Sequence, residues 1–239
     1  MPCLAGCCMK IDFLRRCGSP TLELFFAGWG MDSRPFAWAA DSPHTASCDF
    51  AVCYNYTDME LDGPDKANVN LASANQARPD IRGYSEVRVR AWSLGVYAAS
   101  LVLPGLGCNV STAVAINGTL WPVDDDLGIP HAVYDATAAN LSAESLERFN
   151  RRMCGAHRAV FEARKPLRSV DSLRAELLHI RECAADRSRP QFTGWTQTVL
   201  SSRDKIFPIA NMRRAWPATP QLELDEPHYM PDIPFVTAE

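Results

Sequence analysis

The sequence has no Cys-x-x-Cys pair, no apolar run of membrane-spanning length and no excess of basic residues. Without a Cys-x-x-Cys pair, the sequence does not support a zinc ribbon or a thioredoxin-like site. A membrane helix needs about 18 apolar residues, and the richest stretch, residues 94–106, is interrupted by Ser100 and Pro104. With a net charge of −4, the chain is not typical of proteins that bind nucleic acids.

Nine cysteines are nevertheless present, odd in number and irregularly spaced. We interpret them as free thiols of a protein in a reducing compartment, the cytosol. Cys3, Cys7 and Cys8 lie close together and could bind a soft metal, but no second cysteine pair supports this alternative.

Residues 4–7, Leu-Ala-Gly-Cys, look like the cleavage site of a lipoprotein. A secretory leader also needs basic residues and about 7–15 apolar ones before the cut. Only six residues precede Cys7, and none of them is basic. We therefore expect a cytoplasmic protein, in which residues 1–8 are a disordered extension or precede the true start at Met9.

The length of 239 residues allows one large domain of about 150 residues with a smaller addition. Short apolar runs alternate with helical segments, which predicts an α/β fold with a mostly parallel sheet flanked by helices. A helix is predicted over residues 94–103, ended by Pro104 and Gly105. The predicted strands are residues 22–27, 49–54, 86–91, 112–117, 195–201 and 222–224.

The pattern changes after about residue 121, where amphipathic helices replace strands. One helix begins after Ser142, a plausible N-cap, and a second begins near Ser169 or Asp171. Strand patterns return near residue 195. We therefore expect a core of residues 9–121 and 193–239 with an inserted helical lid, residues 122–192.

A candidate nucleophile lies between a predicted strand and a predicted helix, in residues 91–95, Ala-Trp-Ser-Leu-Gly. A sharp turn there holds the Ser93 hydroxyl clear of the backbone, and it needs small residues two before and two after the serine. Ala91 replaces the usual first glycine. The alternative is a serine that only caps a packed helix.

A serine hydroxyl needs a base, and α/β-hydrolases present the partners in the order Ser, Asp, His. Asp204 and His228 follow in that order, and each comes after a predicted strand, where open α/β sheets place their sites. The other histidines, His44, His131, His157 and His179, precede the nucleophile or lie in the lid. Three adjacent acids, Asp124, Asp125 and Asp126, have only His131 nearby, so we interpret them as structural rather than as metal ligands.

An ester hydrolase also needs two backbone N–H groups directed at the developing oxyanion. Leu94, which follows the nucleophile, is one candidate donor. The other is Trp29, because Gly28 and Gly30 on either side permit a close approach of the backbone. The alternative for residues 28–30 is an ordinary glycine turn.

Five segments in this order, residues 25–32, 91–96, 115–119, 149–155 and 204–208, together resemble the BioG-type family of pimeloyl-[acyl-carrier-protein] methyl ester esterases of biotin synthesis. The resemblance covers about residues 9–235. It implies an α/β-hydrolase fold with a helical lid, and hydrolysis of the methyl ester of a pimeloyl chain carried on acyl carrier protein, which gives methanol. Ser93, Asp204 and His228 correspond to the catalytic triad of the family. No cofactor or metal is implied, and no nucleic acid or membrane partner is expected.

The predicted lid carries a basic cluster. Between residues 148 and 168, seven basic residues and one acidic residue, Glu162, give a formal charge of +6 in a chain of −4 overall. Acyl carrier proteins are strongly acidic, and complementary charge steers encounter. The residues alone leave an ordinary solvated helix face as the alternative. The basic residues are Arg148, Arg151, Arg152, Arg158, Arg164, Lys165 and Arg168, of which we expect Arg148, Arg151, Arg152 and Arg158 to contact the carrier protein.

Two further functions remain open at this point. A thioesterase or a broad-specificity short-chain carboxylesterase could use the same three residues. A non-catalytic binding protein with a hydrolase fold is the third possibility, although no triad position is missing from the sequence.

Overall fold

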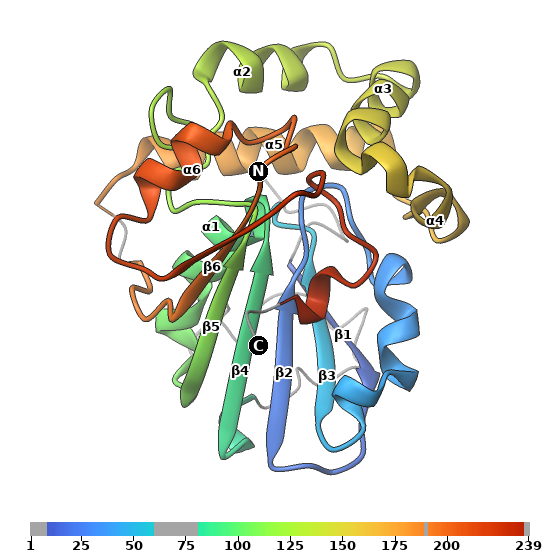
Figure 1. Cartoon of the computed structure of the whole chain (residues 1–239), viewed down its shortest axis with the longest axis vertical. Helices are drawn as coiled ribbons and strands as arrows, with labels where there is room; N and C mark the ends of the chain where they lie inside the picture. Colours follow the sequence, from blue (N-terminus) through green and yellow to red (C-terminus); the bar gives the residue numbers. More distant parts are fainter. Residues whose placement is uncertain (1–8, 60–80, 189–190, 237–239) are drawn as a thin grey trace, which may run out of the picture.

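The structure, a computed structural model, describes residues 9–59, 81–188 and 191–236. Its strands form a seven-stranded sheet in the order β1-β3-β2-β4-β5-β6-β7 (Figure 1). β1 runs antiparallel to β3, and every other neighbouring pair is parallel. The predicted α/β fold with a mostly parallel sheet is thus confirmed. The strands are β1 (Lys10–Arg15), β2 (Thr21–Phe26), β3 (Asp49–Tyr54), β4 (Glu86–Trp92), β5 (Val110–Ile116), β6 (Gln197–Ser201) and β7 (Gln221–Leu224).

Alternating side chains of the inner strands enter two hydrophobic cores, one on each face of the sheet. In β2, Leu24 and Phe26 join the core that contains helix α1, whereas Phe25 points to the opposite face. That second face is covered by the C-terminal segment, where Tyr229 and Ile233 are fully buried. Complete burial of each large apolar side chain stabilises the fold by about 1.5–3 kcal/mol.

The helices are α1 (Leu94–Leu106), α2 (His131–Ala139), α3 (Ala143–Cys154), α4 (Arg158–Ala163), α5 (Val170–Ala185) and α6 (Ile209–Ala215). Four of them, α2 to α5, lie between β5 and β6 in the chain. Figure 1 shows these four gathered above the end of the sheet toward which the parallel strands point. The predicted N-cap Ser142 is confirmed, because its side chain accepts the backbone N–H of Ser145. The predicted start of the second helix near Ser169 is also confirmed, and the side chain of Ser169 accepts the N–H of Ser172. The division into core and lid at residues 122 and 192 stays a prediction.

Helix α1 continues to Leu106, so the predicted end at Pro104 and Gly105 is wrong. A proline inside a helix removes the N–H that would bond the carbonyl four residues earlier. Here that carbonyl, of Ser100, accepts the backbone N–H of Phe192 at 2.7 Å instead. The helix ends at Gly107, which adopts a left-handed conformation with φ of +61°.

Four strands or α-helices were not predicted from the sequence: β1, α2, α4 and α6. β1 alternates Lys10 and Asp12 with Ile11 and Phe13, and it is an edge strand that pairs only with β3. Its polar face reduces the apolar signal of a strand. Helices α2, α4 and α6 span only nine, six and seven residues, and segments this short form mainly through packing against the rest of the molecule.

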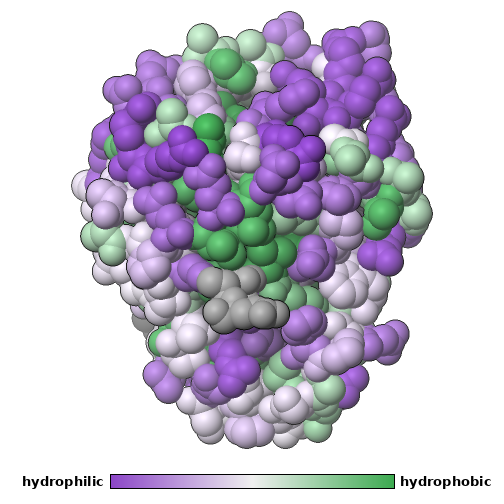
Figure 2. Space-filling model, viewed as in Figure 1, coloured by the Kyte–Doolittle hydropathy of each residue, from purple (hydrophilic) through white to green (hydrophobic). Residues whose placement is uncertain are grey.

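The surface also bears on function. Figure 2 shows mainly hydrophilic residues over the lid helices at the top of this view, with hydrophobic residues gathered near its centre. Within the described ranges, no helix has the length and apolar character that crossing a membrane requires. Residues 1–8, predicted to be an extension, lie outside the described residues.

Candidate active site

Ser93 lies at the turn between β4 and α1 and has a strained backbone, with φ of 60° and ψ of −131°. Such a conformation costs a non-glycine residue about 1–3 kcal/mol and occurs mostly at functional sites. Close contacts on both sides hold the turn. A Cβ atom on Gly95 would lie 2.3 Å from the carbonyl oxygen of Ala27, and one on Gly118 would lie 2.2 Å from that of Ser93. The small residue predicted at position 95 is therefore required by the packing.

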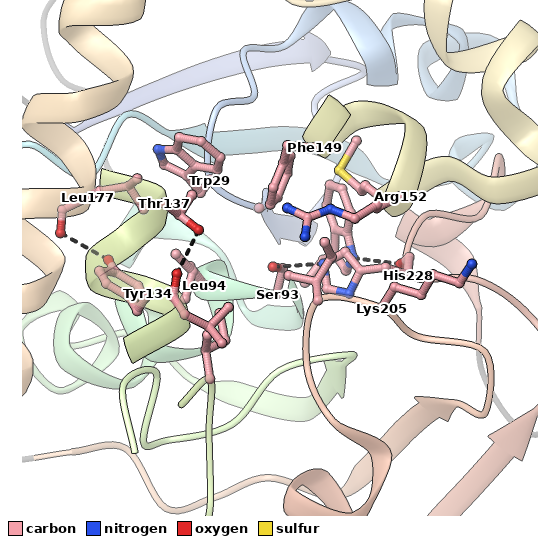
Figure 3. A pocket seen from close by; sticks show the side chains of 16 residues that line it. Trp29, Ser93, Leu94, Tyr134, Thr137, Phe149, Arg152, Leu177, Lys205 and His228 are labelled. Carbon is pink, nitrogen blue, oxygen red and sulfur yellow. Dashed lines mark hydrogen bonds between the residues drawn. The ribbon is translucent and has the colours of Figure 1, made fainter. Parts of the chain in front are cut away.

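The structure brings together the three side chains singled out from the sequence. Nε2 of His228 lies 2.9 Å from the Ser93 hydroxyl oxygen, and Nδ1 of His228 lies 2.6 Å from Oδ2 of Asp204. Figure 3 shows the Ser93 hydroxyl directed at the imidazole ring. The side chains of His228 and Asp204 are 1% and 0% exposed, so their interaction is shielded from water.

Asp204 is oriented by its own backbone surroundings. Its other carboxylate oxygen, Oδ1, accepts the N–H groups of Ile206 at 2.7 Å and Phe207 at 3.0 Å. The ring of Phe207 stacks on the imidazole of His228 at an interplanar angle of 9°. One short loop after β6 therefore supplies both the carboxylate and a flat surface for the imidazole.

Two residues without a predicted role hold the backbone of His228. Its carbonyl oxygen accepts Nε1–H of Trp92 at 3.1 Å and an Nδ2–H of Asn117 at 2.9 Å. Asn117 also bonds Ser201 through both the side chain and the backbone N–H of that residue. Asn117 lies directly after β5 with a positive φ of 47°. A polar residue at the carboxyl end of a buried strand was the available signal for it in the sequence.

The proposed oxyanion donors lie beside the nucleophile. Trp29 and Leu94 line the same pocket as Ser93 and His228. The indole of Trp29 is held by α5 and α3, because its Nε1–H donates to the carbonyl of Leu173 at 2.9 Å and its ring meets Phe149 edge-on at 5.0 Å. The assignment of the Trp29 and Leu94 N–H groups as donors stays a proposal.

The pocket extends to both sides of Ser93 and differs in character between them. In Figure 3, Trp29, Tyr134 and Leu177 lie on one side, and Arg152 and Lys205 lie on the other. The apolar side suits a hydrocarbon chain, whereas the cationic side suits an anionic group. The lining consists of Gly28, Trp29, Trp92, Ser93, Leu94, Ile129, Val133, Tyr134, Thr137, Phe149, Arg152, Met153, Leu177, Lys205, Ile206 and His228.

The basic cluster between residues 148 and 168 is less uniform than its sequence suggests. Arg148 pairs with Glu144, and Arg158 pairs with Glu147, both acids of α3. Arg168 is buried against Glu176 rather than exposed. Among the four arginines predicted to meet a carrier protein, Arg151 and Arg152 are exposed and form no ion pair with any described residue. A free positive charge on α3 is therefore concentrated at these two residues.

The acids at positions 124–126 have local partners. Oδ1 of Asp124 accepts the N–H groups of Asp126 and Leu127, and Oδ2 pairs with Arg187 at 2.7 Å. Oδ1 of Asp125 accepts the backbone N–H of His131 at 2.9 Å. In the part of the chain that the structure describes, no three His, Cys, Asp or Glu side chains gather as metal ligands would.

Comparison with protein families and curated proteins gives two kinds of match. The model of the family described as pimeloyl-ACP methyl esterase BioG matches residues 9–234. A malonyl-[acyl-carrier protein] O-methyltransferase of Bacteroides fragilis is 36% identical over 205 residues, which are 83% of this chain. This chain spans only 38% of that longer relative. An uncharacterized protein of Haemophilus influenzae is 33% identical over 87% of this chain and 88% of its own length.

Solved structures agree with these matches. The crystal structure of BioG from Haemophilus influenzae has a TM-score of 0.74 and 32% identity, and the match covers 93% of this chain and 94% of that one. An epoxide hydrolase of Bacillus megaterium has a TM-score of 0.53 at 12% identity, a likeness of the fold alone. The sheet order, the strained serine turn and these neighbours together show an α/β-hydrolase fold.

Proposed function

This chain belongs to the BioG family of pimeloyl-ACP methyl esterases, and on this basis we propose that it hydrolyses the methyl ester of a pimeloyl chain carried on acyl carrier protein. The products are methanol and the carrier protein with a free pimeloyl carboxylate. Removal of the methyl group would end the phase in which the chain is elongated like a fatty acid, within biotin synthesis. The observation that carries the proposal is the hydrogen-bonded series of Ser93, His228 and Asp204.

In the proposed reaction, His228 takes the proton of Ser93 through Nε2 as the serine oxygen attacks the ester carbonyl carbon. The N–H groups of Trp29 and Leu94 bind the oxyanion that forms. His228 then protonates the leaving methoxide, and methanol departs. A water molecule, deprotonated by His228, attacks the acyl-enzyme, and His228 returns this proton to the Ser93 oxygen as the carboxylate is released. Asp204 holds the imidazole in the required tautomer and stabilises its charged form.

The pocket supports a long acyl substrate. Its apolar lining residues, which include Ile129, Val133 and Leu177, suit the methylene groups of the chain because burial of each contributes about 0.8 kcal/mol. The exposed Arg151 and Arg152 suit an acidic carrier protein, which charge complementarity would orient over the pocket.

The proposal is tested by mass spectrometry of carrier-bound pimeloyl methyl ester incubated with the wild-type protein and with Ser93→Ala. The wild type should remove the mass of the methyl group and release methanol. Ser93→Ala should leave the substrate intact while it still binds the carrier protein. Near-full demethylation by Ser93→Ala would rule out the serine mechanism.

The same experiment separates the methyl esterase from a thioesterase with the same triad. A thioesterase would release the free thiol of the carrier protein and leave the methyl ester on the acid. Detection of free thiol without methanol would overturn the proposed substrate bond, although Ser93 would remain the nucleophile.

A further inference from the structure

A buried ion pair joins the lid to the loops beside the candidate active site. Nη1 of Arg168, which precedes α5, lies 2.6 Å from Oε2 of Glu176 in α5. Their side chains are 8% and 0% exposed. Burial raises the pKa of the Glu176 carboxyl, and the neighbouring guanidinium opposes this effect. Burial removes the favourable interaction of both charges with water, and this cost offsets much of the attraction between them. The ion pair by itself therefore adds little to the free energy of unfolding.

The pair is connected to two loops of the core. The carboxylate of Glu176 accepts the backbone N–H of Tyr56 at 2.9 Å and that of Gly30 at 3.4 Å. Arg168 donates to the carbonyl of Met31 at 3.2 Å and to the side chain of Asn55 at 2.7 Å. The loops after β2 and β3 are thus both held by the segment of the lid that begins at Arg168.

The loop after β2 contains Trp29, whose N–H is the proposed oxyanion donor. Gly30, the next residue, is the one whose N–H bonds Glu176. The indole of Trp29 bonds the carbonyl of Leu173, one turn before Glu176 on α5, and packs against Phe149 (Figure 3). The side chain of Trp29 and the backbone that follows it are therefore both attached to α5.

We propose that Glu176 is a positioning residue of the esterase reaction, which holds residues 28–31 so that the N–H of Trp29 faces the oxyanion. This inference rests on the serine mechanism proposed above. It assigns the pair of Glu176 and Arg168 a role in the transition state, where the position of the donor matters, rather than in substrate binding. Loss of one oxyanion donor lowers kcat by about 10²- to 10³-fold in serine hydrolases, and a displaced donor should cost a part of that factor.

The test uses Glu176→Gln with a short aryl ester as substrate and a trifluoromethyl ketone as a reversible inhibitor. Attack of Ser93 on the ketone gives a tetrahedral oxyanion that needs the same donors. We expect kcat to fall by about 10- to 100-fold while KM stays within about twofold, and the inhibition constant to rise by the same factor as kcat falls. Glu182→Gln, an exposed acid on the same helix, is the matched control and should leave all three values unchanged.

The inhibition constant distinguishes a displaced oxyanion donor from a loss of folded protein. If part of the variant is unfolded, the apparent kcat falls, but the folded molecules still bind the inhibitor with wild-type affinity. If Glu176→Gln does not fold, Glu176→Leu combined with Arg168→Met removes both buried charges together, and the same changes are expected. A folded variant with wild-type kcat, or one with a lower kcat and an unchanged inhibition constant, overturns the inference. The aryl ester keeps this outcome separate from the proposed substrate, because a wild type that cleaves the aryl ester but not the carrier-bound ester would contradict the proposed function alone.

Discussion

At the scale of single residues, the candidate site depends on a few directed hydrogen bonds. Asp204 uses one carboxylate oxygen for two backbone N–H groups and the other for His228. The first pair of bonds sets the orientation of the carboxylate, and the second bond then sets that of the imidazole. Each oxygen therefore has a distinct task, which a substitution can separate.

Asp204→Asn should lower kcat by about 10⁴-fold. The amide oxygen of asparagine can still accept the N–H groups of Ile206 and Phe207, so its NH₂ group would face Nδ1 of His228. The imidazole would then carry its proton on Nε2 and could not accept the proton of Ser93. Steady-state kinetics with an aryl ester measures the effect, and the midpoint of thermal unfolding is the control. Activity within tenfold of the wild type would contradict the proposed role of Asp204.

The cysteines give a second prediction at this scale. Among the described residues they are free thiols; Cys17 is exposed, whereas Cys53 and Cys154 are buried. Burial raises the pKa of Cys154 to about 12 and that of Cys53 further. Because only the thiolate reacts and a raised pKa lowers its fraction, iodoacetamide at about pH 8 should label Cys17 and spare Cys53 and Cys154. Peptide mass spectrometry measures this, and labelling of the buried pair in native protein at the rate seen in urea would contradict it.

At the scale of elements, the turn from β4 into α1 positions Ser93, the proposed nucleophile, and it does so through steric contacts. Gly95 passes close to the carboxyl end of β2, where the carbonyls of Phe26 and Ala27 lie. The same end of β2 leads into the loop that carries Trp29. The proposed nucleophile and the proposed oxyanion donor are therefore positioned by one contact between neighbouring elements.

Gly95→Ala should destabilise the protein by about 1–3 kcal/mol, the usual cost of overpacking, and lower kcat. Its Cβ would lie 2.3 Å from the carbonyl oxygen of Ala27 and 2.5 Å from that of Phe26, so β2 or α1 would have to move. Gly105→Ala in the same helix is the matched control, since its Cβ would meet no atom within 4 Å. Urea unfolding and aryl-ester kinetics measure both variants. Equal behaviour of the two would show that the close approach at Gly95 does not matter.

At the scale of the whole molecule, charge is distributed unevenly over the chain. The chain is acidic overall, yet Arg151 and Arg152 on α3 are exposed and unpaired among the described residues. Arg152 also lines the pocket, whereas Arg151 does not. A substitution of Arg151 therefore tests carrier binding without a change in the lining of the pocket.

Arg151→Glu should raise KM for the carrier-bound substrate by roughly three- to tenfold, because it places a negative charge where the acidic carrier is proposed to bind. KM for a short aryl ester should not change. Lys10→Glu, an equal change of charge at an exposed position of the edge strand β1, is the control. The effect should also weaken at high salt. An equal rise in KM for both substrates would contradict the proposed docking surface.

Several features of the site could be predicted from the sequence because each depends on near neighbours or on chain order. The strand, turn and helix around Ser93 follow from apolar periodicity and from the small residues at positions 91 and 95. Asp204 and His228 follow from their order and from their position after strands. β1, α2, α4 and α6 could not be predicted in this way, since their short or partly polar segments are stabilised by contacts with distant parts of the chain.

The amino-acid sequence by itself determined the mostly parallel fold, the family and the residue types available for the chemistry, because these follow from local patterns. The tertiary structure alone decided which groups meet. It placed Asn117 and Trp92 on the carbonyl of His228. It also buried Arg168 against Glu176, although the sequence shows that arginine as part of a basic cluster. The contacts with His228 join residues that are 136 and 111 positions apart. Arg168 and Glu176 are close in the chain, but their pair is buried because this segment packs against the loops after β2 and β3.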